Sequence, residues 1–302
     1  MSAAGRRLGV IGAGNIGGAI AANLLADGHV VAVHDIEASR CRRLVESGAR
    51  AVGSPADVAA ASEVTFTSLP SPVVMEAVAQ AWLAGAPRDT VLVDLSTNAP
   101  AVIRAVGARL AAAGRHLLEA PLTGGAPGAQ ARMLVFMVGG ERAVYERCLP
   151  LLRRLGRATF HMGPLGLGNT AKLVNSLLAF SATWSSLEGL AVAAKAGINL
   201  RTMIEVIRAG GAGNFFTERM VEGINERGRP TQFALALAAK DAGLLLEVAR
   251  AADVPVPVAA EVAQALVAAV DAGLGGRDFT DLVELIERRA GVALRLPPPR
   301  TT

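Results

Sequence analysis

The feature that most constrains the fold of this chain is a glycine turn near its N-terminus. An apolar run over residues 8–13, LGVIGA, leads into glycines spaced as G-x-G-x-x-G, and a helical pattern continues to about Asp27. In such a turn the first glycine permits the tight bend, the second lets backbone approach a pyrophosphate, and the third lets the helix pack on the strand. The motif therefore predicts a dinucleotide bound at a helix N-terminus. The cofactor-binding residues expected here are Gly12, Ala13, Gly14, Asn15, Ile16 and Gly17.

Asp35 indicates which dinucleotide binds. A second apolar run, residues 30–35, ends at this aspartate, close to the spacing of about 20 residues that the motif expects. Its carboxylate would accept hydrogen bonds from the adenosine ribose and repel a 2′-phosphate, which favours NAD over NADP. Arginines after the second strand can bind that phosphate, so NADP stays possible because of Arg40, Arg42 and Arg43.

Strand and helix patterns alternate through the first half of the chain. Further strands are expected at 50–52, 63–68, 90–95, 115–119 and 133–139. This alternation indicates a doubly wound parallel sheet of the Rossmann-like α/β class, whose ligands lie beyond the carboxyl ends of the strands. We predict that this domain covers residues 1–164.

Only helical patterns follow. They run over 170–196, 200–209, 214–223, 233–251, 257–272 and 278–289. We therefore predict an all-α C-terminal domain over residues 165–295, with an interdomain helix from about 168 and a disordered tail over 296–302. The apolar helices of residues 170–272 suggest burial against another subunit, so a homodimer or homotetramer is expected.

Three loops reach the expected ligand edge of the sheet. Ser68-Leu69-Pro70 follows one strand, Ser96-Thr97 follows the next, and EAPLTGGAPGA follows a third. Thr123, Gly124 and Gly125 combine a hydroxyl with consecutive N–H groups, an arrangement suited to a carboxylate. Each loop also has a purely structural interpretation, as a strand stop at Pro70, a helix cap at Ser96-Thr97, or a flexible connection.

Lys172 stands out because the chain otherwise uses arginine. Lysine occurs only at 172, 195 and 240. A desolvated amine can lose its proton near neutral pH, and a guanidinium cannot. Asn175 and Ser176 lie three and four residues further along a helical pattern, so they share one face with Lys172. A lysine that merely reaches solvent from a helix end is the alternative.

Composition and segment patterns argue against several classes of protein. The net charge is only +4 and the basic residues are scattered, so no nucleic-acid surface is expected. Cys41 and Cys148 lie far apart, which predicts neither a disulfide framework nor a metal site and fits a reducing cytoplasm. The N-terminus offers no long apolar signal segment. Polar residues interrupt the apolar stretch 177–194, which favours a buried helix over a membrane span.

Taken in order, GAGNIG, Asp35, SLP, DLST, EAPLTGGAPGA, GLGNTAKLVNS and KD resemble the β-hydroxyacid dehydrogenase family. That family is typified by 3-hydroxyisobutyrate dehydrogenase and tartronate semialdehyde reductase, and it is related to the N-terminal part of 6-phosphogluconate dehydrogenase. The resemblance covers roughly residues 7–290. Its most specific part is the T-G-G loop followed by G-x-G-x-x-x-K-x-x-N. It implies an active site in the cleft between the two domains.

The resemblance also implies a role for each motif. Lys172 would be the general acid/base, Thr123, Gly124 and Gly125 would hold the substrate carboxylate, and Asn175 would orient the substrate. Ser96 or Thr97 would lie near the nicotinamide ribose, with Leu69 and Pro70 along the cofactor and Lys240 reaching towards it. Further substrate-lining residues are expected at Ser176, Asn214 and Phe215.

Four positions depart from the usual family pattern. Thr123 replaces the commoner serine, Glu119 stands where aspartate is typical, Arg132 stands where glycine is common, and Ser176 replaces a second asparagine. The hydroxyl survives at 123, so carboxylate binding is still expected. Substrate identity is less constrained, because Thr123 and Ser176 both border the expected pocket.

The expected reaction is oxidation of a small 3-hydroxy acid, or reduction of the corresponding aldehyde or keto acid. A hydride moves between the carbinol carbon and NAD, or NADP, while Lys172 takes or returns the hydroxyl proton. Desolvation would lower the pKa of Lys172 towards the working pH. Hydroxyisobutyrate, glycerate or tartronate semialdehyde, 4-hydroxybutyrate or succinic semialdehyde, and 3-hydroxy amino acids all fit. The alternatives are an imine reductase, which usually carries Asp or Tyr in place of Lys172, and a non-catalytic dinucleotide-binding scaffold.

Overall fold

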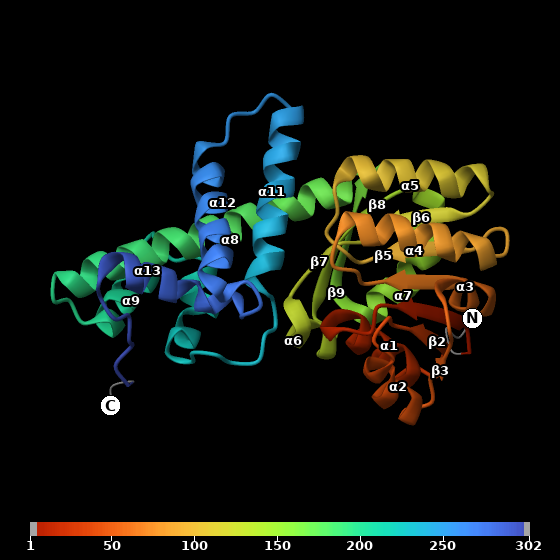
Figure 1. Cartoon of the computed structure of the whole chain (residues 1–302), viewed down its shortest axis with the longest axis horizontal. Helices are drawn as coiled ribbons and strands as arrows, with labels where there is room; N and C mark the ends of the chain where they lie inside the picture. The colour runs from red at the N-terminus through yellow and green to blue at the C-terminus, as the bar shows by residue number, and fades with distance from the viewer. Residues whose placement is uncertain (1–4, 299–302) are drawn as a thin grey trace. The chain divides into compact units, whose positions relative to one another are not determined.

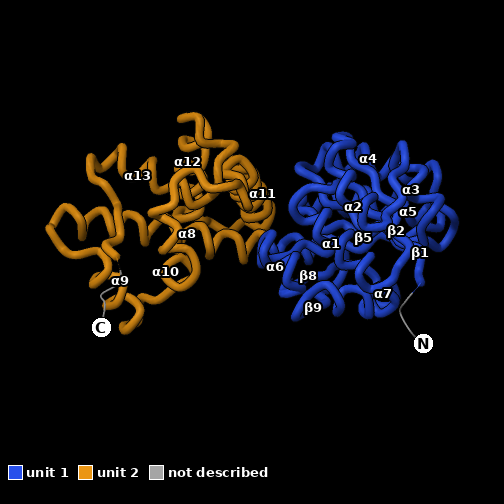
Figure 2. Tube along the Cα trace, turned by 90° about the horizontal axis from the view of Figure 1, so that it is seen from below, with its two compact units in different colours: residues 1–172 blue, residues 173–302 orange. Residues whose placement is uncertain are grey.

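The chain folds into two compact units, residues 1–172 and 173–302 (Figure 2). The computed structural model describes residues 5–298. The division between the units falls inside helix α8 (Leu167–Lys195), just after Lys172. The sequence placed the domain boundary earlier, at residue 164, before this helix begins.

The first unit is built on one sheet. Its strands are β1 Arg7–Ile11, β2 Val30–His34, β3 Arg50–Ala51, β4 Val64–Thr67, β5 Val91–Asp94, β6 His116–Glu119, β7 Leu122–Thr123, β8 Leu134–Gly139 and β9 Gly156–Gly163. The order is β3-β2-β1-β4-β5-β6-β8-β7, and β9 pairs with β8. Strands β1 to β6 are all parallel, and the order reverses between β1 and β4, which is where open α/β sheets bind ligands. The predicted doubly wound fold is confirmed.

Helices cover both faces of this sheet (Figure 1). They are α1 Asn15–Ala26, α2 Arg42–Glu46, α3 Pro55–Ala61, α4 Pro72–Gly85, α5 Pro100–Ala112, α6 Gly125–Gln130 and α7 Arg142–Leu155. One apolar cluster packs α1 and α7 against the sheet, and a second packs α3, α4 and α5. Strands β4 and β5 are therefore buried along their whole length, as is usual for parallel strands covered on both faces of the sheet.

The sheet is not wholly parallel, which corrects the prediction. Strand β8 runs antiparallel to β6 and β7, with Glu119 opposite Gly139 and Leu122 opposite Phe136. A parallel β6–β8 pair would need a crossover, usually through a helix on one face of the sheet. Here β7 instead continues the direction of β6, and the chain turns back through α6. Strands β7 and β9 were not predicted, because β7 has only two residues and β9 lacks a continuous buried face.

The second unit is helical, as predicted. After α8 come α9 Leu200–Ala209, α10 Phe215–Arg219, α11 Leu235–Ala251, α12 Pro257–Ala269 and α13 Val283–Ala290. Within residues 173–298 the β-structure consists of one isolated bridge, between Ala234 and Asp278. One apolar cluster, which includes Phe180, Phe216 and Phe279, forms the core of this unit.

Two helical segments are long and apolar enough to cross a membrane. They are α8, with a mean hydropathy of 1.3, and Pro257–Leu274, with 1.4. Both contribute side chains to the core of the second unit, among them Leu187, Leu190 and Leu266. This packing agrees with the buried helix expected over residues 177–194, and it gives Pro257–Leu274 the same place in the core.

Leu296 departs from the predicted disordered tail. Its main-chain N–H donates to Asn225 Oδ1 at 2.9 Å, its carbonyl accepts from Asn225 Nδ2 at 2.9 Å, and its side chain is buried. Disorder from residue 296 is therefore wrong at its start, because Asn225 satisfies this backbone. Residues 299–302 lie outside the described part of the chain.

Arg132 occupies a position that suits glycine. Its φ is +59°, in the left-handed region, which accounts for the glycine common there in the resembling sequences. Its guanidinium donates to Asp27 Oδ2 at 2.8 Å and to Asn23 O at 3.1 Å, and Arg154 donates to Asp27 Oδ1 at 2.8 Å. These contacts offset the backbone strain. Hydrogen bonding from Arg154 and then from Arg132 holds the pKa of Asp27 well below its usual range, although burial opposes the shift.

We predict a specific pH dependence for the stability that Asp27 confers. Because the pKa of this carboxyl is depressed in the folded state, its contribution is complete above the unfolded pKa of about 4 and is lost as the pH falls below it. Asp27→Asn should therefore lower the free energy of unfolding by about 2 kcal/mol at neutral pH and by progressively less in acid. Urea unfolding between about pH 3 and pH 7 measures this difference. Glu46→Gln, at an exposed site on α2, is the control, and a constant difference across the pH range would contradict the assignment.

Candidate active site

The three glycines of the turn after β1 meet different surroundings. Gly12 has a φ of +89°, and a Cβ on it would stand 2.2 Å from Ser68 O. A Cβ on Gly17 would stand 1.8 Å from Gly12 O. At Gly14 the nearest atom would be Arg40 Nη1, at 3.8 Å. Packing therefore requires the first and third glycines, whereas the second borders open space, as a site for a pyrophosphate needs.

The N-terminus of α1 follows this turn. The helix begins at Asn15, with Gly14 as its N-cap and no side-chain capping bond. Asn15, Ile16 and Gly17 thus form the first turn of this helix. Main-chain donors and the positive end of the helix dipole lie together here, so the residues fit a dinucleotide phosphate.

Asp35 lies directly after β2 and is buried. Its Oδ2 accepts from the N–H of Ala13 at 2.7 Å, and its Oδ1 accepts from the N–H of Glu37 at 2.8 Å. The aspartate therefore fixes the glycine turn to the loop after β2, a role that the sequence did not reveal. A carboxylate has about four lone-pair sites, so two bonds leave capacity for ribose hydroxyls. Burial, with the charge of Asp35, raises the pKa of the Cys41 thiol, which disfavours thiolate chemistry there.

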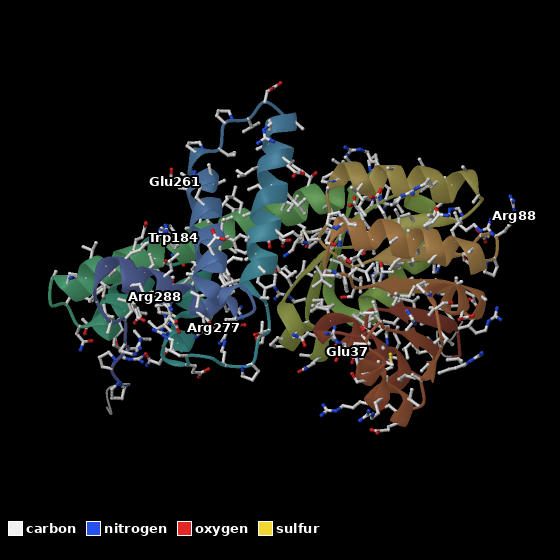
Figure 3. The ribbon with its side chains drawn as sticks, viewed as in Figure 1. Glu37, Arg88, Trp184, Glu261, Arg277 and Arg288 are labelled. Atoms are coloured by element: carbon white, nitrogen blue, oxygen red, sulfur yellow. The ribbon has the colours of Figure 1, made fainter. Side chains whose placement is uncertain are left out.

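Glu37 forms an ion pair with Arg40, the arginine nearest the glycine turn. Figure 3 labels it on the loop between β2 and α2. Arg40 Nε lies 2.8 Å from Glu37 Oε2, and Ser39 Oγ donates to Glu37 Oε1 at 3.0 Å. The guanidinium beside Gly14 is thus neutralised by a carboxylate from its own loop. Arg42 and Arg43 are exposed in the first turn of α2.

A row of side chains marks the carboxyl edge of the sheet. Thr67, Asp94 and Glu119 stand directly opposite one another at the ends of β4, β5 and β6. Two of these three residues are acids with no exposed surface. Two buried carboxylates on adjacent strands need many hydrogen-bond donors, because burial of an unsatisfied charge is costly.

Asp94 gathers the loops that follow β4 and β5. Its Oδ1 accepts from Thr67 Oγ1 at 2.9 Å and from Ser96 Oγ at 2.7 Å, and its Oδ2 accepts from Asn98 Nδ2 at 2.7 Å. Ser96 Oγ in turn accepts from the N–H of Leu69 at 2.8 Å. Burial raises the pKa of Asp94, and the hydrogen bonds from Ser96 and Thr67 oppose that rise.

These bonds separate two residues that the sequence treated as equivalents. The Ser96 hydroxyl both donates and accepts within the protein, and its side chain is buried. Thr97, which follows it, is half-buried, so of the pair it is the better candidate for a contact with the nicotinamide ribose. Leu69 is half-buried and Pro70 is exposed in the neighbouring loop.

Glu119 binds the start of α8. Its Oε1 accepts from the N–H groups of Gly166 at 2.5 Å and Gly168 at 2.9 Å. Its Oε2 accepts from the N–H of Asn169 at 3.1 Å and also from Asn169 Nδ2. Burial raises the pKa of Glu119, and the bonds from Asn169 are the main opposing effect. Lys172, half-buried, lies one helical turn beyond Asn169.

The T-G-G loop has a backbone that suits its two glycines. Thr123 ends β7 opposite Val135, and the next two residues have φ values of +121° for Gly124 and +61° for Gly125. Both glycines are exposed and lead into α6, which has no side-chain cap. The loop therefore presents main-chain N–H groups and a half-buried hydroxyl, the donors that a carboxylate would need.

The predicted residues of the second unit differ in how fully they are engaged. On α8, Asn175 is exposed and Ser176 is buried. Asn214 caps α10, where its Oδ1 accepts from the N–H of Phe216 at 3.0 Å and its Nδ2 donates to Ser186 Oγ at 3.0 Å. A structural role thus accounts for this asparagine, while Phe215 beside it is 49% exposed. Lys240 pairs with Asp241 at 2.9 Å.

Sequence reasoning missed three members of the polar network, Asp94, Asn98 and Asn169. Asn98 and Asn169 are fully buried and joined by a bond of 2.7 Å from the N–H of Asn98 to Asn169 Oδ1. Their only local signal was an unexplained asparagine in each of two motifs, DLSTNAP and GLGNTAK. Glu119 was noticed only as a departure from the family pattern.

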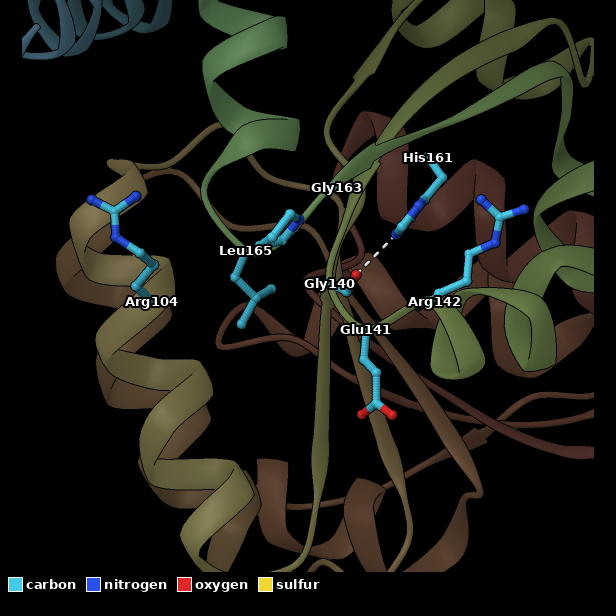
Figure 4. Close-up of a pocket in the computed structure, with 8 residues that line it drawn as sticks. Arg104, Gly140, Glu141, Arg142, His161, Gly163 and Leu165 are labelled. Carbon is cyan, nitrogen blue, oxygen red and sulfur yellow. Dashed lines mark hydrogen bonds between the residues drawn. The ribbon is translucent and has the colours of Figure 1, made fainter.

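A separate hollow of about 510 Å³ lies near the ends of β8 and β9 (Figure 4). It is lined in part by Arg104, Arg142, His161 and Leu165 and contains none of the predicted site residues. His161 Nε2 lies 2.9 Å from Gly140 O, and Arg142 is paired with Glu146 at 2.8 Å. His161 and Arg142 are therefore already engaged by other groups of the protein.

Comparison with known proteins places these features in context. Residues 7–163 match the family described as the NAD binding domain of 6-phosphogluconate dehydrogenase, and residues 166–286 match NAD-binding of NADP-dependent 3-hydroxyisobutyrate dehydrogenase. The chain is 33% identical to 2-(hydroxymethyl)glutarate dehydrogenase of Eubacterium barkeri, covering 95% of this chain and 97% of the relative. It is 34% identical to 3-hydroxyisobutyrate dehydrogenase of Pseudomonas aeruginosa, covering 91% and 96%. The solved structure of Mycobacterium tuberculosis 3-hydroxyisobutyrate dehydrogenase with L-serine aligns with a TM-score of 0.85 at 27% identity, covering 93% and 98%.

Proposed function

The chain belongs to the β-hydroxyacid dehydrogenase family and is an NAD(P)-dependent oxidoreductase of hydroxy acids, and on that premise we propose its reaction. It interconverts a small 3-hydroxy acid of the 3-hydroxyisobutyrate type and the corresponding aldehyde or keto acid, with Lys172 as general acid/base. The observation that carries this proposal is the position of Lys172. The lysine stands one turn beyond Asn169, and hydrogen bonds join Asn169 to the loops after β4 and β5.

The proposed mechanism divides the work among residues of known position. The N–H groups at the start of α1 hold the dinucleotide phosphates, and the bound nicotinamide supplies hydride transfer. Thr123, Gly124 and Gly125 hold the substrate carboxylate through a hydroxyl and main-chain N–H groups. Neutral Lys172 takes the proton from the substrate hydroxyl in oxidation, and its ammonium returns that proton in reduction. Fixing the substrate at its carboxylate orients the carbinol carbon, an effect worth several kcal/mol in favourable cases.

We further propose roles for the remaining predicted residues. Thr97, Leu69, Pro70 and Lys240 contact the cofactor, and Asn175, Ser176 and Phe215 contact the substrate. Asn214 is the weakest of this set, since its side chain already caps α10. The support for these roles is the resemblance of the motifs to those of the β-hydroxyacid dehydrogenase family, taken residue by residue at the matching positions.

The first test is a panel of small 3- and 4-hydroxy acids with NAD and with NADP, followed at the nicotinamide absorbance. We expect turnover of a 3-hydroxy acid and loss of kcat by about 10²- to 10⁴-fold in Lys172→Ala, because proton transfer by a positioned base contributes that much. Cofactor affinity should be retained. Lys195→Ala, at the other end of α8, is the matched control.

Undiminished activity of Lys172→Ala would remove the lysine from the mechanism. Cyclic imines with NADPH test the imine reductase alternative in the same assay. Turnover of imines without turnover of hydroxy acids would replace the proposed reaction. The scaffold alternative is set aside, because the chain belongs to a family of dehydrogenases and reductases.

We propose that NAD is preferred over NADP. Asp35 and Glu37 place two carboxylates just after the end of β2, where an added 2′-phosphate would be repelled. Glu37 also occupies Arg40, the arginine nearest the glycine turn. Glu37, which was not among the residues considered from the sequence, therefore offsets part of the positive charge that would attract the 2′-phosphate of NADP.

Glu37→Gln tests this balance. Loss of the carboxylate leaves Arg40 without its ion-pair partner and removes a repulsive charge, so the ratio of kcat/KM with NADP to kcat/KM with NAD should rise by about tenfold or more. Glu46→Gln removes a charge from the same helical region without touching Arg40 and should leave the ratio unchanged. An unaltered ratio in Glu37→Gln, or a wild-type preference for NADP, would refute the proposed selectivity.

We also propose that the protein is a cytoplasmic enzyme and that it forms a homodimer or a homotetramer. Helix α8 exposes Val174, Leu178 and Val192 by 46%, 65% and 71%, and such apolar side chains along one helix favour association. Light scattering is expected to give twice or four times the chain mass, and a monomer at micromolar concentration would contradict this.

A further inference from the structure

We propose that Glu119 is a positioning residue for the reaction. Its buried carboxylate sets the first turn of α8, and therefore the place of Lys172, in register with the loops after β4 and β5. The inference rests on the proposed role of Lys172, and it assigns to Glu119 a function beyond folding.

The first support is the set of donors that Glu119 binds. Three of its four hydrogen bonds come from the main-chain N–H groups of Gly166, Gly168 and Asn169. Groups at a helix N-terminus lack partners within the helix, and a negative charge there is favoured by the helix dipole. A strand residue 50 positions earlier in the chain thus supplies the N-terminal cap of α8. These three bonds define where the helix starts.

The second support is the space made for the side chain. A Cβ on Gly139 would stand 2.1 Å from Glu119 Oε1, and a Cβ on Gly168 would stand 2.5 Å from Met137 O and 3.1 Å from Glu119 Cδ. Glutamate is one methylene longer than the aspartate typical at this position. Gly139 on β8 therefore leaves room for the longer side chain, and Gly168 lets the start of α8 approach the backbone of β8 beside it.

The third support is the continuity of the network. Asn169 uses its Nδ2 on Glu119 and its Oδ1 on the N–H of Asn98. Asn98 Nδ2 binds Asp94, which binds Ser96, which accepts from Leu69. Glu119, Asn169, Asn98 and Asp94 are all fully buried. A shift of α8 would thus break its bond to the loop after β5, which in turn binds the loop after β4. A misplacement of about 1 Å can cost about 100-fold in rate.

Glu119→Gln is the test, because an amide of the same shape must turn its NH₂ group towards N–H donors. We expect kcat to fall by about 10- to 100-fold. The KM for NAD should stay within about threefold, because the glycine turn and Asp35 follow β1 and β2. Thr65→Val is the control, since Thr65 is also fully buried and its hydroxyl accepts from Trp82 Nε1 at 2.9 Å, away from α8. It should lower the Tm and leave kcat near the wild-type value.

A second readout does not depend on activity. The chain has three lysines, at 172, 195 and 240, so labelling by an amine-reactive reagent can be assigned residue by residue in a mass spectrum. In Glu119→Gln the first turn of α8 should loosen, and labelling of Lys172 should rise at least about threefold relative to Lys195. Hydrogen exchange of the amides around residues 168–172 should accelerate with it.

The outcomes separate this inference from the proposed function. An unchanged kcat and an unchanged labelling ratio in Glu119→Gln would overturn the positioning role, as would an equal loss of kcat in Thr65→Val. In a further outcome, the wild type turns over no hydroxy acid while Glu119→Gln still changes the labelling ratio. That result would support the positioning of Lys172 by Glu119 and contradict the proposed reaction. If Glu119→Gln does not fold, Asn169→Ala cuts the same network and leaves the three main-chain bonds to Glu119.

Discussion

The carboxylate of Glu119 at the N-terminus of α8 is the interaction on which the arrangement of the candidate site depends. A fully buried charge is costly unless hydrogen-bond donors surround it, and here the start of a helix supplies them. The requirement acts in both directions. A helix that began elsewhere would leave the carboxylate without these donors, and the glycine at 139 leaves room for its side chain.

The parallel sheet explains why this acid lies close to the other polar groups of the site. Strands β4, β5 and β6 pair in register, so Thr67, Asp94 and Glu119 form one row at the carboxyl edge. Loops that leave this edge are then joined by short bonds through Ser96, Asn98 and Asn169. The same edge is where the order of strands reverses beside β1, and the glycine turn follows β1. Fold and chemistry therefore coincide because strand ends gather there.

Three features of the folded chain go beyond what the sequence predicted. Strand β8 runs antiparallel because β7 extends β6 and α6 turns the chain back, and neither short element has a periodic signal. Arg132 has a left-handed backbone, and its guanidinium binds Asn23 of α1 and Asp27, the residue after that helix. Ser96 faces inward because Asp94 is buried below it. All three depend on strand pairing or on side-chain hydrogen bonds of the folded chain.

The sequence by itself determined the alternation of strands and helices, the glycine turn with Asp35, the T-G-G loop and the uncommon lysine at 172. These are local features, because backbone conformation, helical period and residue chemistry can be read within a few positions. Only the tertiary structure decided how they are held together. The bonds from Asn98 to Asn169 and from Glu119 to the start of α8 span 71 and 47 to 50 residues. A hydrogen bond over such a separation leaves no period in the sequence, since its geometry exists only once the sheet has brought the strand ends together.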